Sequence, residues 1–347
     1  MNIKVLIAAG GSGGHLFPAQ QLTEMLQRKG ECELLFAGYK LAQTPFFARE
    51  KIPFVEVAAS PLARIGFPIA FIRGFLKSLK MIRDFGPDVI VGFGSYHVFP
   101  ILCAAVFLGK KLVLFEANSV LGKVNRFFAP FARCIAVQFP MQNGTLVPLL
   151  PWVSHQEKWD QKEARRAYRL DPEIFTFLVF GGSQGAQFLN VAVPQALARM
   201  PGKKQVIHFT GSDEAAVRSV YERLGISACV KQFEPKIAMA YAAADCAICR
   251  SGAGTVAELI RHQLPALLIP FPEAAEDHQR KNGEYLADYH AARLLLQKNA
   301  HPERLISEIE ALIIEIEAKK LRLQKIDLQN VNRSDFADLV RNIGVSE

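Results

Sequence analysis

Two glycine-rich turns, one near the start of the chain and one past its middle, restrict the folds open to this sequence. The first spans residues 10–15 after the apolar run 3–9, and the second spans residues 181–186 after the apolar run 175–180. Each pattern predicts a buried strand, a tight turn and a helix start, so that backbone N–H groups can approach an anion closely. Two such turns predict two α/β domains that face a shared cleft, an arrangement suited to a nucleotide and a second substrate.

Strand-like apolar runs alternate with helix-like segments along both halves, which predicts parallel sheets covered by helices. The strand-like runs of the first half are residues 3–9, 33–37, 54–57, 88–92, 111–115 and 134–137. Those of the second half are residues 175–180, 205–210, 229–232, 245–249, 266–269 and 292–296. Helical patterns cover residues 18–29 and 302–325. Because residues 147–159 break the alternation, we expect one domain over residues 1–150 and another over 160–335.

The composition indicates a globular protein with a basic surface. Half of its 347 residues are hydrophobic, and its formal net charge is +8. A positive surface suits phosphorylated substrates or anionic lipid, whereas the absence of zinc-finger spacing and of a base-reading helix disfavours nucleic acid. The cysteines show no disulfide framework, and the C-x-x-C pattern at 246–249 lies in an apolar run that we interpret as a core strand. We expect neither a signal peptide nor a transmembrane segment.

His15 closes the first glycine turn at the start of a helix. A histidine has an unperturbed pKa of about 6.5, which suits it to general base catalysis. A lone histidine usually has no chemical role, but at the end of a glycine turn we favour a side chain that faces the cleft. No acidic residue ends the strand-like run 33–37, which counts against a dinucleotide cofactor.

A third turn of small residues follows the strand-like run 245–249. Backbone N–H groups at the helix start that it precedes suit a diphosphate. Glu258, further along this helix, suits ribose hydroxyls or serves only as a capping acid. After the run 266–269, Gln279 and Asn282 suit sugar hydroxyls, and the spacing of His278 to nearby acids does not support a metal site.

Residues 66–83 combine apolar side chains at helical spacing with charges that are all positive. The commoner origin of such a pattern is a core-facing helix with a solvated basic face. The alternative is a helix on an anionic membrane surface, which we favour because Phe67 and Phe71 lie beside glycine and proline. The predicted membrane patch consists of Phe67, Ile69, Phe71, Ile72, Arg73, Phe75, Lys77 and Lys80.

Several motifs occur in one order along the chain, and the ordered set is far more specific than any single motif. They are residues 10–18 (GGSGGHLFP), 92–96 (GFGSY), 115–118 (FEAN), 181–186 (GGSQGA) and 249–258 (CRSGAGTVAE), then Asp277, His278 and Gln279 with Asn282. On these motifs, and over nearly its whole length, the chain resembles the MurG family, the bacterial undecaprenyl-diphospho-muramoylpentapeptide β-N-acetylglucosaminyltransferases.

The resemblance implies a GT-B fold, in which two Rossmann-like, doubly wound domains flank a cleft and the last helix, near 336–347, returns to the first domain. It implies inverting transfer of GlcNAc from UDP-GlcNAc to the C4 hydroxyl of undecaprenyl-diphospho-MurNAc-pentapeptide (lipid I) in peptidoglycan synthesis, without a cofactor. The implied partners are UDP-GlcNAc, lipid I, an anionic membrane surface and other cell-wall synthesis proteins. The implied location is peripheral, on the cytoplasmic face of the bacterial inner membrane.

The same resemblance assigns site residues by motif. His15 is implied as a catalytic residue with Tyr96 and Glu116 nearby, and the choice of base between His15 and Glu116 stays open. The residues implied in substrate binding are Ser12, Gly13, Gly14, Asn118, Ser183, Gln184, Glu234, Arg250, Ala253, Gly254, Thr255, Val256, Glu258, Gln279 and Asn282. Residues 253–255 would hold the diphosphate, Glu258 the ribose and Gln279 the GlcNAc, and the segment with Glu234 would lie by the uracil.

Four positions depart from the family pattern. Residues 150–154 read LPWVS where the family has G-N-P-V-R, so the arginine that contacts the donor is absent or replaced. Glu234 stands where an aliphatic residue is usual, Ala117 replaces a glutamine, and Gly254 replaces a bulkier residue. Three alternatives therefore stay open: a nucleotide-sugar enzyme with a soluble acceptor, a dehydrogenase, and a membrane scaffold that has lost donor binding.

Overall fold

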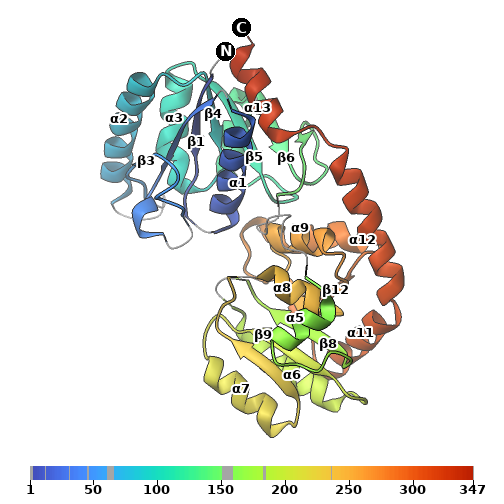
Figure 1. Ribbon diagram of the computed structural model, residues 1–347. Helices are drawn as coiled ribbons and strands as arrows, with labels where there is room; N and C mark the ends of the chain where they lie inside the picture. Colours follow the sequence, from blue (N-terminus) through green and yellow to red (C-terminus); the bar gives the residue numbers. More distant parts are fainter. Residues whose placement is uncertain are drawn as a thin grey trace. The chain divides into compact units, whose positions relative to one another are not determined.

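The chain divides into two compact units, each built on one parallel sheet (Figure 1). One unit comprises Met1–Trp152 and Asn332–Glu347, and the other comprises Val153–Val331. The computed structural model describes residues 3–11, 13–30, 32–44, 47–60, 66–150, 159–182, 185–235 and 237–346. The predicted fold class, two α/β domains with Rossmann-like parallel sheets, is confirmed.

The first unit alternates strands and helices as far as β7 and then receives the last helix of the chain. Its strands are β1 (Ile3–Ala8), β2 (Cys32–Gly38), β3 (Phe54–Glu56), β4 (Val89–Gly92), β5 (Lys111–Glu116), β6 (Cys134–Val137) and β7 (Thr145–Leu146). Its helices are α1 (Gly13–Lys29), α2 (Phe67–Phe85), α3 (Phe99–Phe107), α4 (Lys123–Phe128) and α13 (Phe336–Val345). Short 3₁₀ turns occupy Leu41–Gln43, Tyr96–Val98 and Ala129–Phe131.

The second unit repeats the alternation and ends in two long helices. Its strands are β8 (Thr176–Phe180), β9 (Gln205–Phe209), β10 (Ser227–Lys231), β11 (Cys246–Cys249), β12 (Ala266–Leu268) and β13 (Arg293–Leu294). Its helices are α5 (Gln161–Ala167), α6 (Gln187–Arg199), α7 (Glu214–Arg223), α8 (Ile237–Ala243), α9 (Ala253–Arg261), α10 (His278–Asp288), α11 (Pro302–Ile314) and α12 (Ile316–Val331). Its 3₁₀ turns are Ala275–Asp277 and Gln297–Asn299.

The first sheet has the strand order β3-β2-β1-β4-β5-β6-β7, with all neighbours parallel. Because successive residues of a strand point to opposite faces, Val5 and Ile7 pack in the core that α1 and α13 cover. Leu6 and Ala8 pack in the core that α2 and α3 cover, on the other face (Figure 1). The order changes direction between β1 and β4, and ligands of such sheets bind beyond the carboxyl ends of the strands at that point.

The second sheet has the strand order β10-β9-β8-β11-β12-β13, again with all neighbours parallel. Its order changes direction between β8 and β11, so the turns that follow these two strands share one edge of the sheet. Cys246 and Cys249 are fully buried free thiols within β11. Burial raises the pKa of the Cys246 thiol well above its usual value, and the predicted core strand is confirmed.

Helix α13 packs on the first unit and fills its core. Phe336, Ala337 and Val340 are fully buried there. The Lys29 ammonium pairs with Asp338 at 2.7 Å near the start of α13. At its far end, Lys111 donates hydrogen bonds to the carbonyl oxygens of Gly344, at 3.0 Å, and of Ser346. Charged side chains therefore fix both ends of the helix.

Two elements differ from the sequence prediction. Helix α1 begins at Gly13 instead of residue 18 and keeps Pro18 inside it. Pro18 lacks only the N–H that would bond to the carbonyl of Gly14, and Gly14 is exposed to water. The two-residue strand β7 was not predicted, since so short a pairing has no hydrophobic alternation to reveal it.

A buried histidine lies in β9 of the second sheet. His208 Nε2 is 3.1 Å from Asn190 Oδ1, and Nδ1 is 3.0 Å from the Tyr221 hydroxyl. The Asn190 amide nitrogen already donates to Thr210 O, so Nε2 carries the ring proton and Nδ1 accepts from Tyr221. Burial lowers the pKa of His208 to about 3.

We expect this histidine to make the second unit less stable in mild acid. The unfolded chain takes up the proton below about pH 6.5 and the folded chain does not, so stability is constant above that pH and falls as the pH falls toward 3. Between pH 7 and pH 5 the loss is about 2 kcal/mol. Urea unfolding followed by Trp159 fluorescence, in a Trp152→Phe background, measures it. His208→Gln should flatten this dependence and the exposed control His290→Asn should not; equal slopes for both variants would contradict the assignment.

Candidate active site

His15 lies in the first turn of α1, just after the glycine turn that ends β1. Its Nδ1 is 2.7 Å from the carbonyl oxygen of Phe93, the residue that follows β4. A carbonyl only accepts hydrogen bonds, so Nδ1 carries the proton and Nε2 carries the lone pair. The backbone beyond β4 thus fixes the tautomer of His15 that has a basic nitrogen at Nε2.

A second histidine, His97, belongs to the same cluster and was not predicted from the sequence. Its Nδ1 is 2.7 Å from Ser95 Oγ, and its ring centroid is 3.9 Å from that of Tyr96. A Cβ atom on Gly11 would lie 2.6 Å from Nδ1, so the glycine turn packs directly on this imidazole. Burial, and to a lesser extent the charge of His15, lowers the pKa of His97 to about 4. His97 is therefore neutral at pH 7.

Glu116 ends β5 with a carboxylate that is almost fully engaged. Its side chain is 4% exposed. Oε1 accepts from the backbone N–H of Asn118 at 3.1 Å and from its side-chain amide at 2.9 Å. Oε2 accepts from the Gly122 N–H at 3.0 Å and from the Asn125 amide at 2.9 Å. Four donors hold the carboxylate, which in turn fixes the loop between β5 and α4.

The other residues predicted in the first unit surround these groups. Gly13 is buried and Gly14 is exposed at the start of α1, while Tyr96 and Asn118 are half-buried. Gly94 and Ser95 have consecutive positive φ angles of 72° and 70°. A positive φ is strained for serine, and such strain concentrates at functional sites. Ser12 lies outside the described residues.

In the second unit, helix α9 begins directly after β11 without a side-chain cap. Gly252 is the N-cap residue, and no side chain accepts a hydrogen bond from the first turn. A Cβ atom on Gly254 would meet no atom within 4 Å, so the first turn is open on that side. Thr255 is half-buried beside it, whereas Ala253 and Val256 point into the core. The exposed N–H groups form an electropositive helix end.

Glu258 lies one turn further along α9 and is only 6% exposed. Its Oε2 accepts a hydrogen bond of 2.6 Å from the Tyr241 hydroxyl in α8. Burial, and then the charge of Glu258, raises the pKa of Tyr241 well above its usual value, so the phenol stays a donor. Glu258 is therefore held by a side chain that the sequence analysis did not single out.

Arg250, between β11 and α9, is buried and anchors a neighbouring loop. Its guanidinium donates to the carbonyl oxygens of Ile269 and Pro270, both at 2.9 Å, and to Gln297 Oε1 at 2.7 Å. It also lies 5.5 Å from the ring centre of Phe271. These contacts direct the guanidinium to the segment that follows β12.

That segment orients Gln279 in α10. The backbone N–H of Phe271 donates to Gln279 Oε1 at 3.0 Å, so the amide nitrogen is left for other partners. Asn282 is fully buried, and its amide nitrogen donates to Ser251 O at 3.2 Å. Asn282 therefore ties α10 to the turn before α9. Within the described ranges, no three His, Cys, Asp or Glu side chains are grouped to hold a metal ion.

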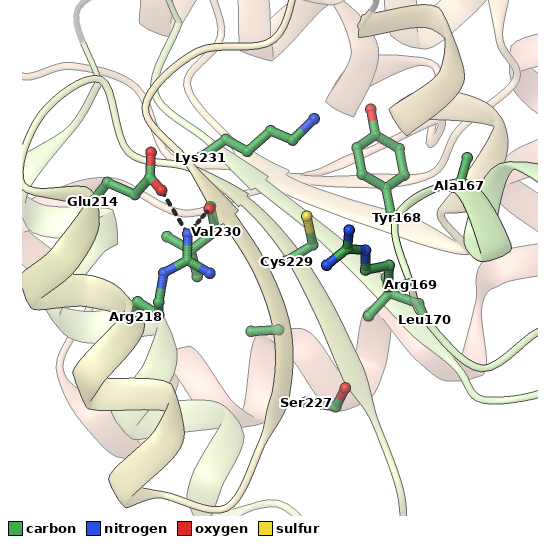
Figure 2. A pocket seen from close by; sticks show the side chains of 11 residues that line it. Ala167, Tyr168, Arg169, Leu170, Glu214, Arg218, Ser227, Cys229, Val230 and Lys231 are labelled. Carbon is green, nitrogen blue, oxygen red and sulfur yellow. Dashed lines mark hydrogen bonds and ion pairs between the residues drawn. The ribbon is translucent and has the colours of Figure 1, made fainter.

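Glu234, beyond β10, is buried with Oε2 at 2.6 Å from Lys231 Nζ. Close by, a hollow of about 480 Å³ is lined by residues from the end of α5, from α7 and from β10 (Figure 2). Arg218 donates to Glu214 and to Val230 O, which occupies the outer edge of β10 (Figure 2). None of the predicted site residues lines this hollow. Ser183, Gln184 and linker residues 151–154 lie outside the described residues.

The predicted membrane patch lies on the outer face of α2. Ile69, Ile72 and Leu76 are 63%, 55% and 59% exposed. Phe67, Phe71 and Phe75 are half-buried and stack in sequence along the helix. Arg73, Lys77 and Lys80 are exposed, and no carboxylate pairs with them in the described part of the chain. No helix among the described residues is both long and apolar enough to cross a membrane.

Comparisons with known proteins cover almost the whole chain. The glycosyltransferase family 28 N-terminal domain matches residues 5–137, and the glycosyltransferase family 28 C-terminal domain matches residues 176–342. The crystal structure of Acinetobacter baumannii MurG is 24% identical and superposes with a TM-score of 0.76 over 98% of this chain and 99% of its own, which shows a shared fold.

Curated relatives are closer in sequence. The UDP-N-acetylglucosamine–N-acetylmuramyl-(pentapeptide) pyrophosphoryl-undecaprenol N-acetylglucosamine transferase of Protochlamydia amoebophila is 36% identical, over 90% of this chain and 88% of its own. The protein of the same name from Nitrosococcus oceani is 37% identical over 90% of each chain. The chain therefore belongs to the MurG family of N-acetylglucosamine transferases, within glycosyltransferase family 28.

Proposed function

We propose that this protein transfers N-acetylglucosamine from UDP-N-acetylglucosamine to the C4 hydroxyl of undecaprenyl-diphospho-N-acetylmuramoyl-pentapeptide, lipid I, in peptidoglycan synthesis. The observation that carries the proposal is its identity, along nine-tenths of the chain, with relatives named for this transfer. The two parallel sheets support it, because each ends in glycine turns at the edge where such sheets bind ligands. In this proposal residues 1–150, with 336–347, take the acceptor, and residues 160–335 take the donor.

The donor site is proposed at the carboxyl edge of the second sheet. The uncapped start of α9 at residues 253–255 holds the diphosphate, because its N–H groups and the helix dipole favour negative charge. Glu258 accepts from the ribose hydroxyls, and the Gln279 amide nitrogen donates to the sugar. Arg250 acts through Phe271, which it holds against Gln279, and not by direct contact with the diphosphate.

For the catalytic base we propose His15 over Glu116. The lone pair on His15 Nε2 suits proton abstraction, whereas both carboxylate oxygens of Glu116 accept two hydrogen bonds each. Nε2 takes the proton as the acceptor oxygen attacks C1 of GlcNAc. The bond from C1 to the diphosphate oxygen breaks with inversion, and UDP leaves toward the α9 N-terminus. Glu116 positions Asn118 and the loop that carries it.

We also propose that α2 docks on the cytoplasmic face of the anionic inner membrane, where the lipid-linked acceptor resides. Three exposed aliphatic side chains can enter the interface, and the neighbouring cations can contact lipid phosphates. The apolar surface continues at Phe107, which is 68% exposed and packs edge-on to Phe75.

Replacing both Ile72 and Leu76 by aspartate is expected to lower binding to phosphatidylglycerol vesicles at least about tenfold, because a buried aliphatic side chain contributes roughly 1.5–3 kcal/mol. Co-sedimentation measures it. Activity toward a short-chain, water-soluble acceptor should stay unchanged. The control Ile314→Asp alters an equally exposed side chain in the second unit. Undiminished vesicle binding by the α2 variant would place the contact elsewhere.

The proposed function is tested by transfer of labelled GlcNAc from UDP-GlcNAc to a short-chain lipid I analogue by the purified protein. UDP release that requires the acceptor, together with a disaccharide product, is the expected result. It would also show that the altered linker at residues 150–154 is tolerated. A folded protein that binds UDP-GlcNAc but forms no product would indicate another acceptor, and one that binds no donor would contradict the proposal.

A further inference from the structure

We infer that Tyr241 is a positioning residue of the donor site, which holds the Glu258 carboxylate for recognition of the nucleotide ribose. The inference rests on the proposed function, because it takes Glu258 to face the ribose of UDP-GlcNAc. Its basis is the 2.6 Å hydrogen bond from the Tyr241 hydroxyl to Glu258 Oε2.

The tyrosine itself has little freedom to move. Its side chain is fully buried, and its ring stacks on the His262 ring with centroids 4.8 Å apart and planes 9° apart. On another side it meets Phe180 edge to face at 5.9 Å. Phe180 is the last residue of β8, immediately before the second glycine turn. The ring therefore fixes the hydroxyl relative to two of the strand ends and helices that form the donor site.

Glu258 needs such a partner because it is an acid in a nearly closed place. A carboxylate that is 6% exposed has lost most of its water, and a hydrogen bond from a neutral donor replaces part of it. Since the phenol stays protonated, it donates at every pH at which the protein is folded. The hydrogen bond fixes one carboxylate oxygen and thereby the rotamer of the other.

Tyr241 also links two parts of the proposed donor site. It lies in α8, which follows the segment with Glu234 proposed to face the uracil, and it contacts α9, which carries the proposed diphosphate site. A change at Tyr241 should therefore alter how the nucleoside is held without altering the transfer chemistry. That is the signature of a positioning residue rather than of a catalytic one.

The test compares Tyr241→Phe with the wild-type protein in calorimetric binding of UDP and of 2′,3′-dideoxy-UDP. The wild type should bind UDP more tightly than the dideoxy compound. The variant should bind UDP about five- to tenfold more weakly, the cost of one hydrogen bond to a charged group, with little change for the dideoxy compound. KM for UDP-GlcNAc should rise while kcat stays within about twofold.

Two further variants separate positioning from simple destabilisation. Tyr221→Phe removes another buried hydroxyl of the same unit, the one bonded to His208, and should leave UDP binding unchanged. In a Glu258→Gln background, Tyr241→Phe should add no further loss for UDP.

Three results would overturn the inference. Equal weakening of UDP and dideoxy-UDP by Tyr241→Phe would mean that the tyrosine only supports the fold. Equal wild-type affinities for the two ligands would remove Glu258 from the ribose and the inference with it, although the proposed function would stand. A wild type that binds neither ligand would contradict the proposed function itself.

Discussion

The variant His15→Ala is expected to lower kcat for GlcNAc transfer by about 10²- to 10⁴-fold, the usual contribution of a general base. The bond from Nδ1 to Phe93 O leaves the lone pair of the neutral ring on Nε2, and no other side chain of the cluster combines such a lone pair with an ordinary pKa near neutrality. His97 is neutral at pH 7 because burial, together with the charge of His15, lowers its pKa to about 4. The Glu116 carboxylate already accepts four hydrogen bonds.

Initial rates of UDP release with a short-chain lipid I analogue measure this loss, and calorimetry with UDP should show unchanged donor binding. His301→Ala, which alters an exposed histidine in the second unit, serves as the control and should retain full activity. The acid limb of the pH–rate profile should disappear in the His15 variant. An unchanged kcat in His15→Ala would remove His15 from the role of base.

Glu116→Gln distinguishes the two candidate bases. An amide has one acceptor oxygen and brings two donors toward groups that already donate, so this variant should lose stability in the loop between β5 and α4. If His15 is the base, the residual activity of Glu116→Gln keeps the acid limb near pH 6.5. A profile that loses this limb in Glu116→Gln, and keeps it in His15→Ala, would reverse the assignment.

Most of the fold follows from the apolar patterns of the sequence. Runs such as 111–115 and 175–180 are continuously apolar because both faces of a parallel strand are covered, and each became a fully or nearly buried strand. Helix α1 was predicted too short because proline usually marks a helix start, whereas here Pro18 lies inside the helix. The order of the strands comes from pairings that no local pattern contains.

The sequence could name many of the candidate site residues but not what holds them. The family motifs include His15, Glu116 and Glu258, whereas the partners Phe93, Asn125 and Tyr241 come from other elements. A buried tyrosine in a short alanine-rich helix is typical of a core residue, and only the 2.6 Å contact gives it another role. His97 follows the motif 92–96 directly, and that adjacency was the one signal that could have found it.

The variant Phe336→Ala is expected to destabilise the first unit by about 3–5 kcal/mol, the usual cost of truncating a buried phenylalanine. Phe336 comes from the last helix, α13, and is fully buried. Its ring stacks on Phe115 with centroids 5.3 Å apart, and lies 6.4 Å from the ring of Phe93. These two residues precede Glu116 and follow β4, so the cavity would open beneath the backbone that holds both His15 and Glu116.

Hydrogen exchange of the amides in β4 and β5 measures this loss, and the amides of β8 and β11 provide an internal reference because Phe336 packs only in the core of the first unit. Val345→Ala, an exposed position on the same helix, should change stability by no more than about 0.5 kcal/mol. We expect Phe336→Ala to lower kcat through the disturbed Phe93 carbonyl while UDP binding in the second unit is preserved. Unchanged exchange in β4 and β5 would mean that α13 does not complete the first core, and unchanged kcat beside faster exchange would separate that core from the position of His15.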